Sequence, residues 1–292
     1  MRLAPAEAHH RVSEAVSRLQ GDGGIFRRFV EGHKLDRVEF WLMKRFRHFP
    51  TSATPGDFAT FGPYTSVSIY QDALEALAQK KEVERTGESR YRLAEPARKA
   101  IAGMYDEYFS YVARVNALPG EEAAALHEWV DRVYAAALRQ SDVPVPILNA
   151  AHSVLPDSDS IWVHIERRLV GLLIYRDDSH IAAWREAGYT GPRIELSTAL
   201  SQAEGGMAHD ELRQATSRLD DKDFASALSA LHSSGEVTRR AGRFRLSRTG
   251  RRVRQGIEAG TDRNYGRPFA ALEEEQIEQM MQLLAKIARA ER

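Results

Sequence analysis

One pattern occurs twice in this 292-residue chain, at positions about 154 residues apart. The stretch ALSALHSSGEVTRRAGRFRLSRTGRR at residues 227–252 matches ALEALAQKKEVERTGESRYRLAEPAR at residues 73–98. In each stretch, two leucines at helical spacing precede a Glu-Val pair, and an aromatic residue between two arginines follows. Solenoid repeats are about 20–50 residues long, so this period is too great for one. The sequence therefore predicts a duplicated domain.

The segment QSDVPVPILNAAHSVLPDSDS, residues 140–160, separates the two copies and contains three prolines. Prolines and small polar residues in such a run are typical of a linker. We therefore predict two domains, residues 1–145 and residues 146–292.

Apolar periodicity and turn residues predict the same order of elements in each half. In the first half we expect helices at 5–19, 35–48, just after Thr54-Pro55, 66–80, 95–116 and 120–140, with strands at 82–86 and 90–93. In the second half we expect helices at 160–187, 193–203, 207–217, 221–234, 248–259 and 270–290, with a hairpin at 236–246. The expected fold class is mainly α with small β-hairpins.

Bulk composition restricts the function. Lys plus Arg and Asp plus Glu are equal, at 41 each, so any contact with nucleic acid must be local. The chain has no cysteine, which excludes disulfides and thiolate catalysis. No apolar run approaches a membrane span, and the start lacks the apolar core of a signal peptide. We expect a cytoplasmic protein with no membrane contact.

Three helices followed by a two-stranded hairpin, with long flanking helices, make this chain resemble the MarR family of bacterial transcription regulators. The stretch DFASALSALHSSGEVTRRAGRFRLSRTGRRV resembles that family's recognition helix, strand, arginine wing and following helix. The stretch FAALEEEQIEQMMQLLAKIARA resembles its last helix, which pairs with a partner subunit. Family members are usually two-fold dimers of chains about half this length. The resemblance implies tandem winged helix-turn-helix domains joined by long pairing helices, acting as a single-chain pseudo-dimer or as a homodimer of it.

A helix-turn-helix lays the start of its recognition helix in the major groove, while phosphates attract Lys and Arg. Between Ala227 and Arg254 the chain has eight arginines and one acid, Glu236. We therefore predict a transcriptional regulator whose partner is double-stranded DNA. The candidate DNA-binding residues are Thr65, Ser66, Ser68, Gln71, Lys80, Arg85, Arg90, Lys222, Ser226, Arg239, Arg240, Arg243 and Arg245.

The residues at the start of the second recognition helix argue against DNA binding. Asp220, Asp221 and Asp223 would repel phosphates, although Asp at a helix start also caps backbone N–H groups. An alternative function therefore stays open: a winged-helix module for protein interaction or small-ligand sensing that has lost DNA binding.

The resemblance also implies a small effector, bound between the reading domain and the pairing helices. The candidate ligand-binding residues are Trp41, Tyr105, Tyr108, Trp129, Trp162 and Tyr175, which are equally typical of a core. Asp177, Asp178 and His180 do not share one helical face well, so we expect no metal site. The chain has no P-loop, GxGxxG or GxSxG motif, and we expect no cofactor and no enzymatic activity.

Overall fold

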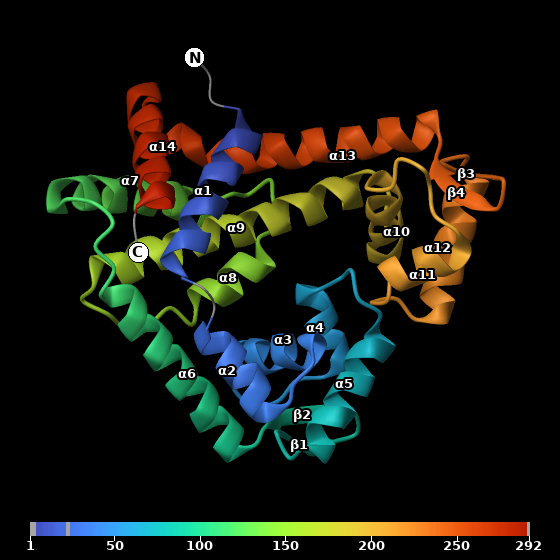
Figure 1. Ribbon diagram of the computed structural model, residues 1–292, viewed down its shortest axis with the longest axis horizontal. Helices are drawn as coiled ribbons and strands as arrows, with labels where there is room; N and C mark the ends of the chain where they lie inside the picture. Colours follow the sequence, from blue (N-terminus) through green and yellow to red (C-terminus); the bar gives the residue numbers. More distant parts are fainter. Residues whose placement is uncertain (1–3, 22–23, 291–292) are drawn as a thin grey trace. The chain divides into compact units, whose positions relative to one another are not determined.

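The computed structural model describes residues 4–21 and 24–290, and most of them lie in helices (Figure 1). The predicted fold class is confirmed, because the described chain is mainly helical and its strands form two small antiparallel pairs. Each pair follows three helices, which is the element order of a winged helix-turn-helix. Among the described residues, no helix has the length and apolar composition that a membrane span requires.

The chain divides into two compact units. The helical unit consists of Met1–Asp36, Arg98–Ala182 and Gly260–Arg292, and the winged unit consists of Arg37–Ala97 and Ala183–Ala259. Each unit thus takes segments from both halves of the sequence. The predicted domains, residues 1–145 and 146–292, were defined by the two copies of the sequence pattern and not by compactness. That division stays a prediction.

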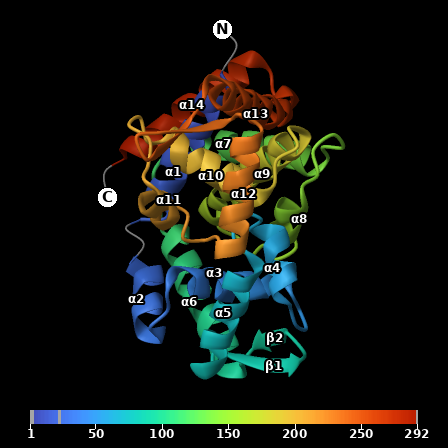
Figure 2. The same ribbon diagram turned by 90° about the vertical axis from the view of Figure 1, so that its right-hand side faces the viewer.

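The winged unit contains the same series of elements twice. The first series is α3 (Arg37–Arg45), η1 (Phe46–His48), α4 (Pro55–Phe61), α5 (Val67–Gln79), β1 (Val83–Gly87) and β2 (Arg90–Leu93). The second series is α10 (Gly191–Ser201), α11 (His209–Ala215), α12 (Asp221–Ser233), β3 (Val237–Arg240) and β4 (Arg243–Leu246), followed by α13 (Arg248–Gly266). In Figure 2, β1 and β2 lie at the end of α5, which β1 contacts.

Capping side chains set the starts of two of these helices. Thr54 accepts a hydrogen bond from the N–H of Asp57 at 3.2 Å, and the Asp57 carboxylate accepts one from the Thr54 N–H at 2.8 Å. Asp220 has the same role at α12, where it accepts from the N–H of Asp223 at 2.7 Å. Losing such a cap costs about 1 kcal/mol, so these residues fix where the helices begin.

The hairpins are tied to the helices before them. In the first series, Ala53, which precedes α4, pairs with Tyr91 of β2. In the second series, Met207, which precedes α11, pairs with Phe244 of β4. The second hairpin turns at Ala241-Gly242, where φ is 48° and 77°. A two-residue turn of this kind places both central residues in the left-handed region, which glycine adopts without strain.

The helical unit is built around one apolar core. Its elements are α1 (Pro5–Leu19), α2 (Gly24–His33), α6 (Glu95–Ala113), α7 (Gly120–Leu138), α8 (Pro146–His152), α9 (Ile161–Glu186), the end of α13, η2 (Arg267–Ala271) and α14 (Glu274–Arg289). Helix α14 packs against α1 and α7. Its side chains at helical spacing, Met280, Leu284 and Ile287, are buried in that core. This apolar stripe is therefore structural.

Two helices were not expected from the sequence. The predicted linker at 140–160 is wrong for 146–152, which form α8. The carboxylate of Asp178, only 1% exposed, accepts from the N–H groups of Ile147 at 3.3 Å and Leu148 at 2.9 Å. This buried cap stabilises a helix too short to be stable alone. The second is α2, and residues 22–23 of the glycine-rich turn before it lie outside the described residues.

Candidate nucleic-acid interface

The hairpin of β3 and β4 presents three exposed arginines, Arg239, Arg240 and Arg245, called the wing arginines below. Strand alternation places Arg240 and Arg245 on the face opposite the buried Phe244. Arg239 lies on the same face as Phe244, with its guanidinium 5.3 Å from the ring centroid. Within the described part of the chain, the wing arginines form no ion pair. Their charges are therefore available to an external anion.

Arg243 has a structural contact instead. Its Nη2 lies 2.6 Å from the Glu211 carboxylate and donates to the carbonyl of Gly206 at 2.8 Å. These bonds fasten the second strand of the wing to the start of α11. The predicted phosphate contact of Arg243 would have to compete with them. Lys222 and Ser226, the other candidates in this half, are exposed on α12.

The cations of the first wing are mostly paired within the protein. Lys80 places Nζ 2.6 Å from both carboxylate oxygens of Glu39. Arg85 forms an ion pair with Glu75. Arg90 is exposed and reaches a serine hydroxyl at 3.4 Å. The two wings therefore differ in the positive charge that they offer to solvent.

Gln71 is also engaged inside the protein. Its amide donates to Glu75 at 2.7 Å and to the Tyr91 hydroxyl at 2.8 Å. Tyr91 donates in turn to Glu75 at 2.5 Å. This hydrogen bond is the main reason that the pKa of Glu75 lies below its usual value. Glu75, a residue of α5, therefore stays ionised.

Helices α5 and α12, predicted from the sequence to be recognition helices, meet at their first turns (Figure 2). Ser66, only 2% exposed, donates its hydroxyl to Asp223 at 2.5 Å and accepts from the N–H of Asp220 at 3.0 Å. Its own N–H donates to the carbonyl of Arg218 at 2.9 Å. Ser68 donates to Asp220 at 2.5 Å. We call the set Ser66, Ser68, Asp220 and Asp223 the serine–aspartate contact.

Two of the three acidic residues at the start of α12, Asp220 and Asp223, take part in this contact. The pKa of Asp220 is lowered, first by the hydrogen bond from the Asp223 N–H and then by that from Ser68. Asp221 lies outside the contact: its side chain is 96% exposed and pairs with Arg213 at 2.8 Å. Ser66 and Ser68 were expected to face a DNA groove, and both hydroxyls are engaged here within the protein.

Thr65, the remaining candidate near the start of α5, also bonds locally. Its N–H donates to the Gly62 carbonyl at 3.2 Å, and that carbonyl also accepts from the Tyr70 hydroxyl at 2.9 Å. Dimeric helix-turn-helix proteins place recognition helices in grooves about 34–36 Å apart. Helices whose first turns share hydrogen bonds cannot enter two successive major grooves at once. The winged unit in this arrangement is therefore closed to two-groove reading.

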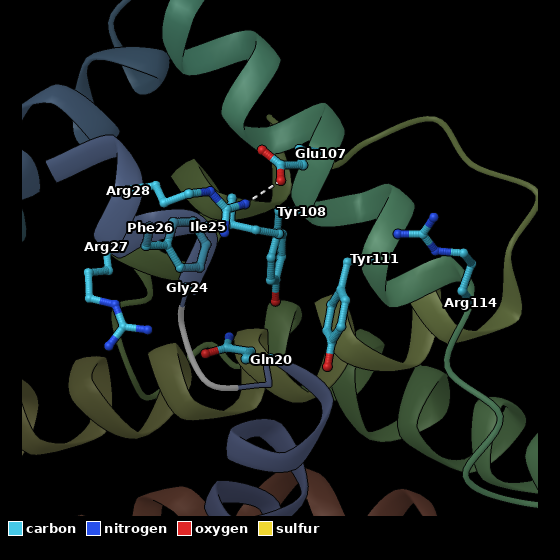
Figure 3. Close-up of a pocket in the computed structure, with 10 residues that line it drawn as sticks. All are labelled: Gln20, Gly24, Ile25, Phe26, Arg27, Arg28, Glu107, Tyr108, Tyr111 and Arg114. Carbon is cyan, nitrogen blue, oxygen red and sulfur yellow. Dashed lines mark hydrogen bonds and ion pairs between the residues drawn. The ribbon is translucent and has the colours of Figure 1, made fainter. Parts of the chain in front are cut away.

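A cavity of about 300 Å³ lies in the helical unit, between the end of α1, α2 and α6 (Figure 3). Aromatic rings of Phe26, Tyr108 and Tyr111 line it. Three arginines, Arg27, Arg28 and Arg114, line it as well, and Arg28 pairs with Glu107. The lining thus combines flat apolar surfaces with an excess of positive charge.

Tyr108 joins the cavity to a buried carboxylate. Its hydroxyl donates to Glu166 at 2.5 Å, and Glu166 is 0% exposed. Arg167 pairs with that carboxylate, and Gln20 donates to it at 3.0 Å. Burial is the main cause of the raised pKa of Tyr108. The tyrosine therefore stays neutral and is held firmly against the wall of the cavity.

The other predicted ligand-binding residues lie elsewhere. Trp162 and Tyr175 are buried, and the Tyr175 hydroxyl donates to the Asn264 carbonyl at 3.0 Å. The remaining three are half-buried. Tyr105 and Trp129 pack against the core of the helical unit, and Trp41, in the winged unit, stacks on Tyr70. Of the six candidates, Tyr108 is the one that lines the cavity in Figure 3.

The acidic and histidine side chains of α9 have separate partners. Asp178 caps α8, and His180 Nδ1 lies 3.0 Å from Thr261 Oγ1. Over residues 4–21 and 24–290, no group of three or more His, Asp or Glu side chains is placed to hold a metal ion.

No curated protein and no solved structure matches this chain. A helix-turn-helix family matches residues 58–292. The matched region begins within α4 and includes the recognition helices, both hairpins and the long helices after them. This chain therefore belongs to that helix-turn-helix family.

Proposed function

We propose that this chain is a DNA-binding transcriptional regulator whose second wing holds the phosphate backbone. One observation carries the proposal: the wing arginines are exposed beside a helix-turn-helix, with no acidic partner in the described chain. Membership of a helix-turn-helix family supports the same function at a coarse level. No catalytic step is part of the proposal.

Arginine suits this role for a physical reason. Its planar guanidinium can donate two parallel hydrogen bonds to one phosphate, and it enters narrow minor grooves readily. Each phosphate that is neutralised releases counterions, so binding weakens as salt rises. The chain has equal numbers of acidic and basic residues, so this local cluster is expected to supply most of the attraction.

We further infer that the two halves arose by duplication and act as a MarR-like pseudo-dimer within one chain. The repeated order of elements supports this, as do the matching bridges of Ala53 with Tyr91 and of Met207 with Phe244. Two halves of one chain can diverge in sequence. The preferred DNA site is therefore expected to lack two-fold symmetry.

The effector that we propose is a small aromatic anion bound in the cavity of the helical unit. Ring walls from Tyr108 and Tyr111 would stack on a flat ligand, and Arg27 and Arg114 would attract its charge. Titration calorimetry with benzoate tests this part. Heat of binding that disappears in Arg114→Ala supports the site, and equal heat in both proteins places the ligand elsewhere.

Fluorescence anisotropy on mixed genomic duplex fragments, titrated with salt, tests the DNA-binding function. The Arg239→Ala/Arg240→Ala variant should bind more weakly across all sequences, with a salt slope smaller by about two. The control variant, Arg139→Ala/Arg289→Ala, removes two exposed arginines of the helical unit and should bind as the wild type does. Equal behaviour of the two variants contradicts the proposal.

A second candidate function is a winged-helix module for protein interaction or ligand sensing. The serine–aspartate contact favours it, because Ser66 and Ser68, which were expected to contact DNA, are bonded to aspartates of α12. If the Arg239→Ala/Arg240→Ala change leaves DNA affinity unaltered but disturbs a protein partner, this candidate replaces the first.

A further inference from the structure

We propose that the start of α12 is a built-in competitor of DNA for the start of α5. Asp220 and Asp223 would occupy, within the chain, the hydroxyl groups that α5 would offer to a phosphate. This inference rests on the proposed DNA-binding function and adds a means of regulation at the same site.

Several hydrogen bonds hold the contact together. Four of them join the two helix starts: Ser66 to Asp223, Ser68 to Asp220, and one from each helix's leading backbone N–H. Ser66 occupies the N-cap position of α5 but makes no capping bond to its own helix. Its hydroxyl serves the other helix instead, so the contact is built from both sides.

The acceptors of the contact resemble a phosphate in their chemistry. A carboxylate and a phosphate are both anions that accept hydrogen bonds from hydroxyl and N–H groups. Both are favoured at the positive end of a helix dipole. The two carboxylates therefore accept from the serine hydroxyls that an incoming phosphate would use, and they repel that phosphate as well.

The contact is able to open at its exposed side. The Ser68–Asp220 bond is exposed to solvent, and the exposed Val67 lies between the two serines. Water can replace these partners without leaving a buried group unsatisfied at that position. At Ser66, which is buried, opening must separate the helix starts. The contact is thus a closed state that DNA has to displace.

The first test is a charge-matched pair of variants in the anisotropy assay. Asp220→Asn/Asp223→Asn keeps the size of both side chains and leaves a good capping residue at position 220. It should bind DNA about ten-fold more tightly than the wild type, because the contact loses its charged acceptors. The control, Asp210→Asn/Asp221→Asn, removes two exposed carboxylates that have other partners. Equal gains in both variants overturn the proposal, since net charge alone would then explain them.

The second test uses the absence of cysteine from the chain. Ser68→Cys/Asp220→Cys places two thiols where side chains now hydrogen-bond, and mild oxidation should join them within the chain. The oxidised protein should bind DNA at least about ten-fold more weakly than the same protein after reduction. Failure to form the cross-link overturns the proposal, because the helix starts then do not meet in solution.

The outcomes separate this inference from the function on which it rests. DNA binding that is equal in the oxidised and reduced proteins overturns the competitor and leaves the regulator function intact. No DNA binding by any protein, open or closed, overturns both. Two results together support both the regulator function and the competitor. The Ser68→Cys/Asp220→Cys protein binds DNA more tightly when reduced than when oxidised, and Asp220→Asn/Asp223→Asn binds more tightly than the wild type.

Discussion

Lys80 holds its ammonium group 2.6 Å from both carboxylate oxygens of Glu39, whose side chain is 2% exposed. The pair joins the end of α5 to α3 inside the winged unit. It also explains why Lys80, expected to meet DNA, has a structural role in this arrangement.

Removing Lys80 should destabilise the winged unit more than loss of a surface charge would. Lys80→Ala leaves Glu39 buried without its main partner, which is expected to cost roughly 3 kcal/mol. Urea unfolding followed by the fluorescence of Trp41, on α3, measures the change. Lys81→Ala is the matched control, because that neighbouring lysine is exposed and should be nearly neutral. Similar losses in both variants would contradict the structural role of Lys80.

Substitution by alanine should change the stability of the protein in opposite directions at two glycines, Gly191 and Gly256. A Cβ at Gly191, the first residue of α10, would lie 1.6 Å from the Pro63 carbonyl oxygen. Gly191→Ala is therefore expected to cost about 3 kcal/mol, since backbone must move to admit it. Gly256, inside α13, has no atom within 4 Å of such a Cβ. Gly256→Ala should stabilise the protein by about 0.5–1 kcal/mol through helix propensity. Thermal unfolding of both variants checks the opposite signs.

The helical unit should lose stability in mild acid because of His127. Burial lowers the pKa of His127 below 6.5, and His164, 5.5 Å away between ring centroids, lowers it further. Below pH 6.5 the unfolded chain therefore binds a proton that the folded chain binds only at lower pH. The free energy of unfolding then falls as the pH drops from 6.5 through the folded pKa.

The measurement is chemical unfolding at pH 7.5 and at pH 5.5, in the wild type and in His127→Gln. The glutamine variant should lose less stability over this interval, because it lacks the group that takes up the proton. An equally steep loss in both proteins would assign the pH dependence to other groups.

The two wings should contribute unequally to DNA binding. Arg85→Ala/Arg90→Ala should weaken binding less than Arg239→Ala/Arg240→Ala does, because Arg85 already pairs with Glu75. A hydroxyl-radical footprint on a selected site should accordingly be asymmetric. Equal effects of the two double variants, or a symmetric footprint, would show that the wings are equivalent.

Local signals predicted most of the fold. The capping residues Thr54 and Asp220, the alternation of the hairpin strands and the turn at Gly242 each act over a few residues, so the sequence displays them directly. The sequence did not predict helix α8, because the residue that caps it, Asp178, lies 30 residues further along the chain. A prediction based on neighbouring residues cannot find such a partner.

The candidate site was harder to predict for the same reason. The wing arginines could be identified from the sequence because Glu236 is the only acid among eight arginines between Ala227 and Arg254. The partners of Ser66 and Ser68 lie more than 150 residues away, and the acids of α12 suggested only caps or repulsion of DNA. One signal was present: Ser66 and Asp220 are 154 residues apart, which is the spacing of the repeated pattern.

That spacing has a consequence for how such a contact could arise. In a symmetric dimer, a residue on the two-fold axis faces its own copy, so serine would meet serine and aspartate would meet aspartate. Two aspartates would repel each other, and two serines would make a weaker, uncharged bond. Within one chain, equivalent positions can hold different residues: positions 66 and 220 hold serine and aspartate, and the N–H of Asp220 donates to the hydroxyl of Ser66. The proposed single-chain pseudo-dimer could therefore pair unlike residues at these two positions, which a dimer of identical subunits could not do.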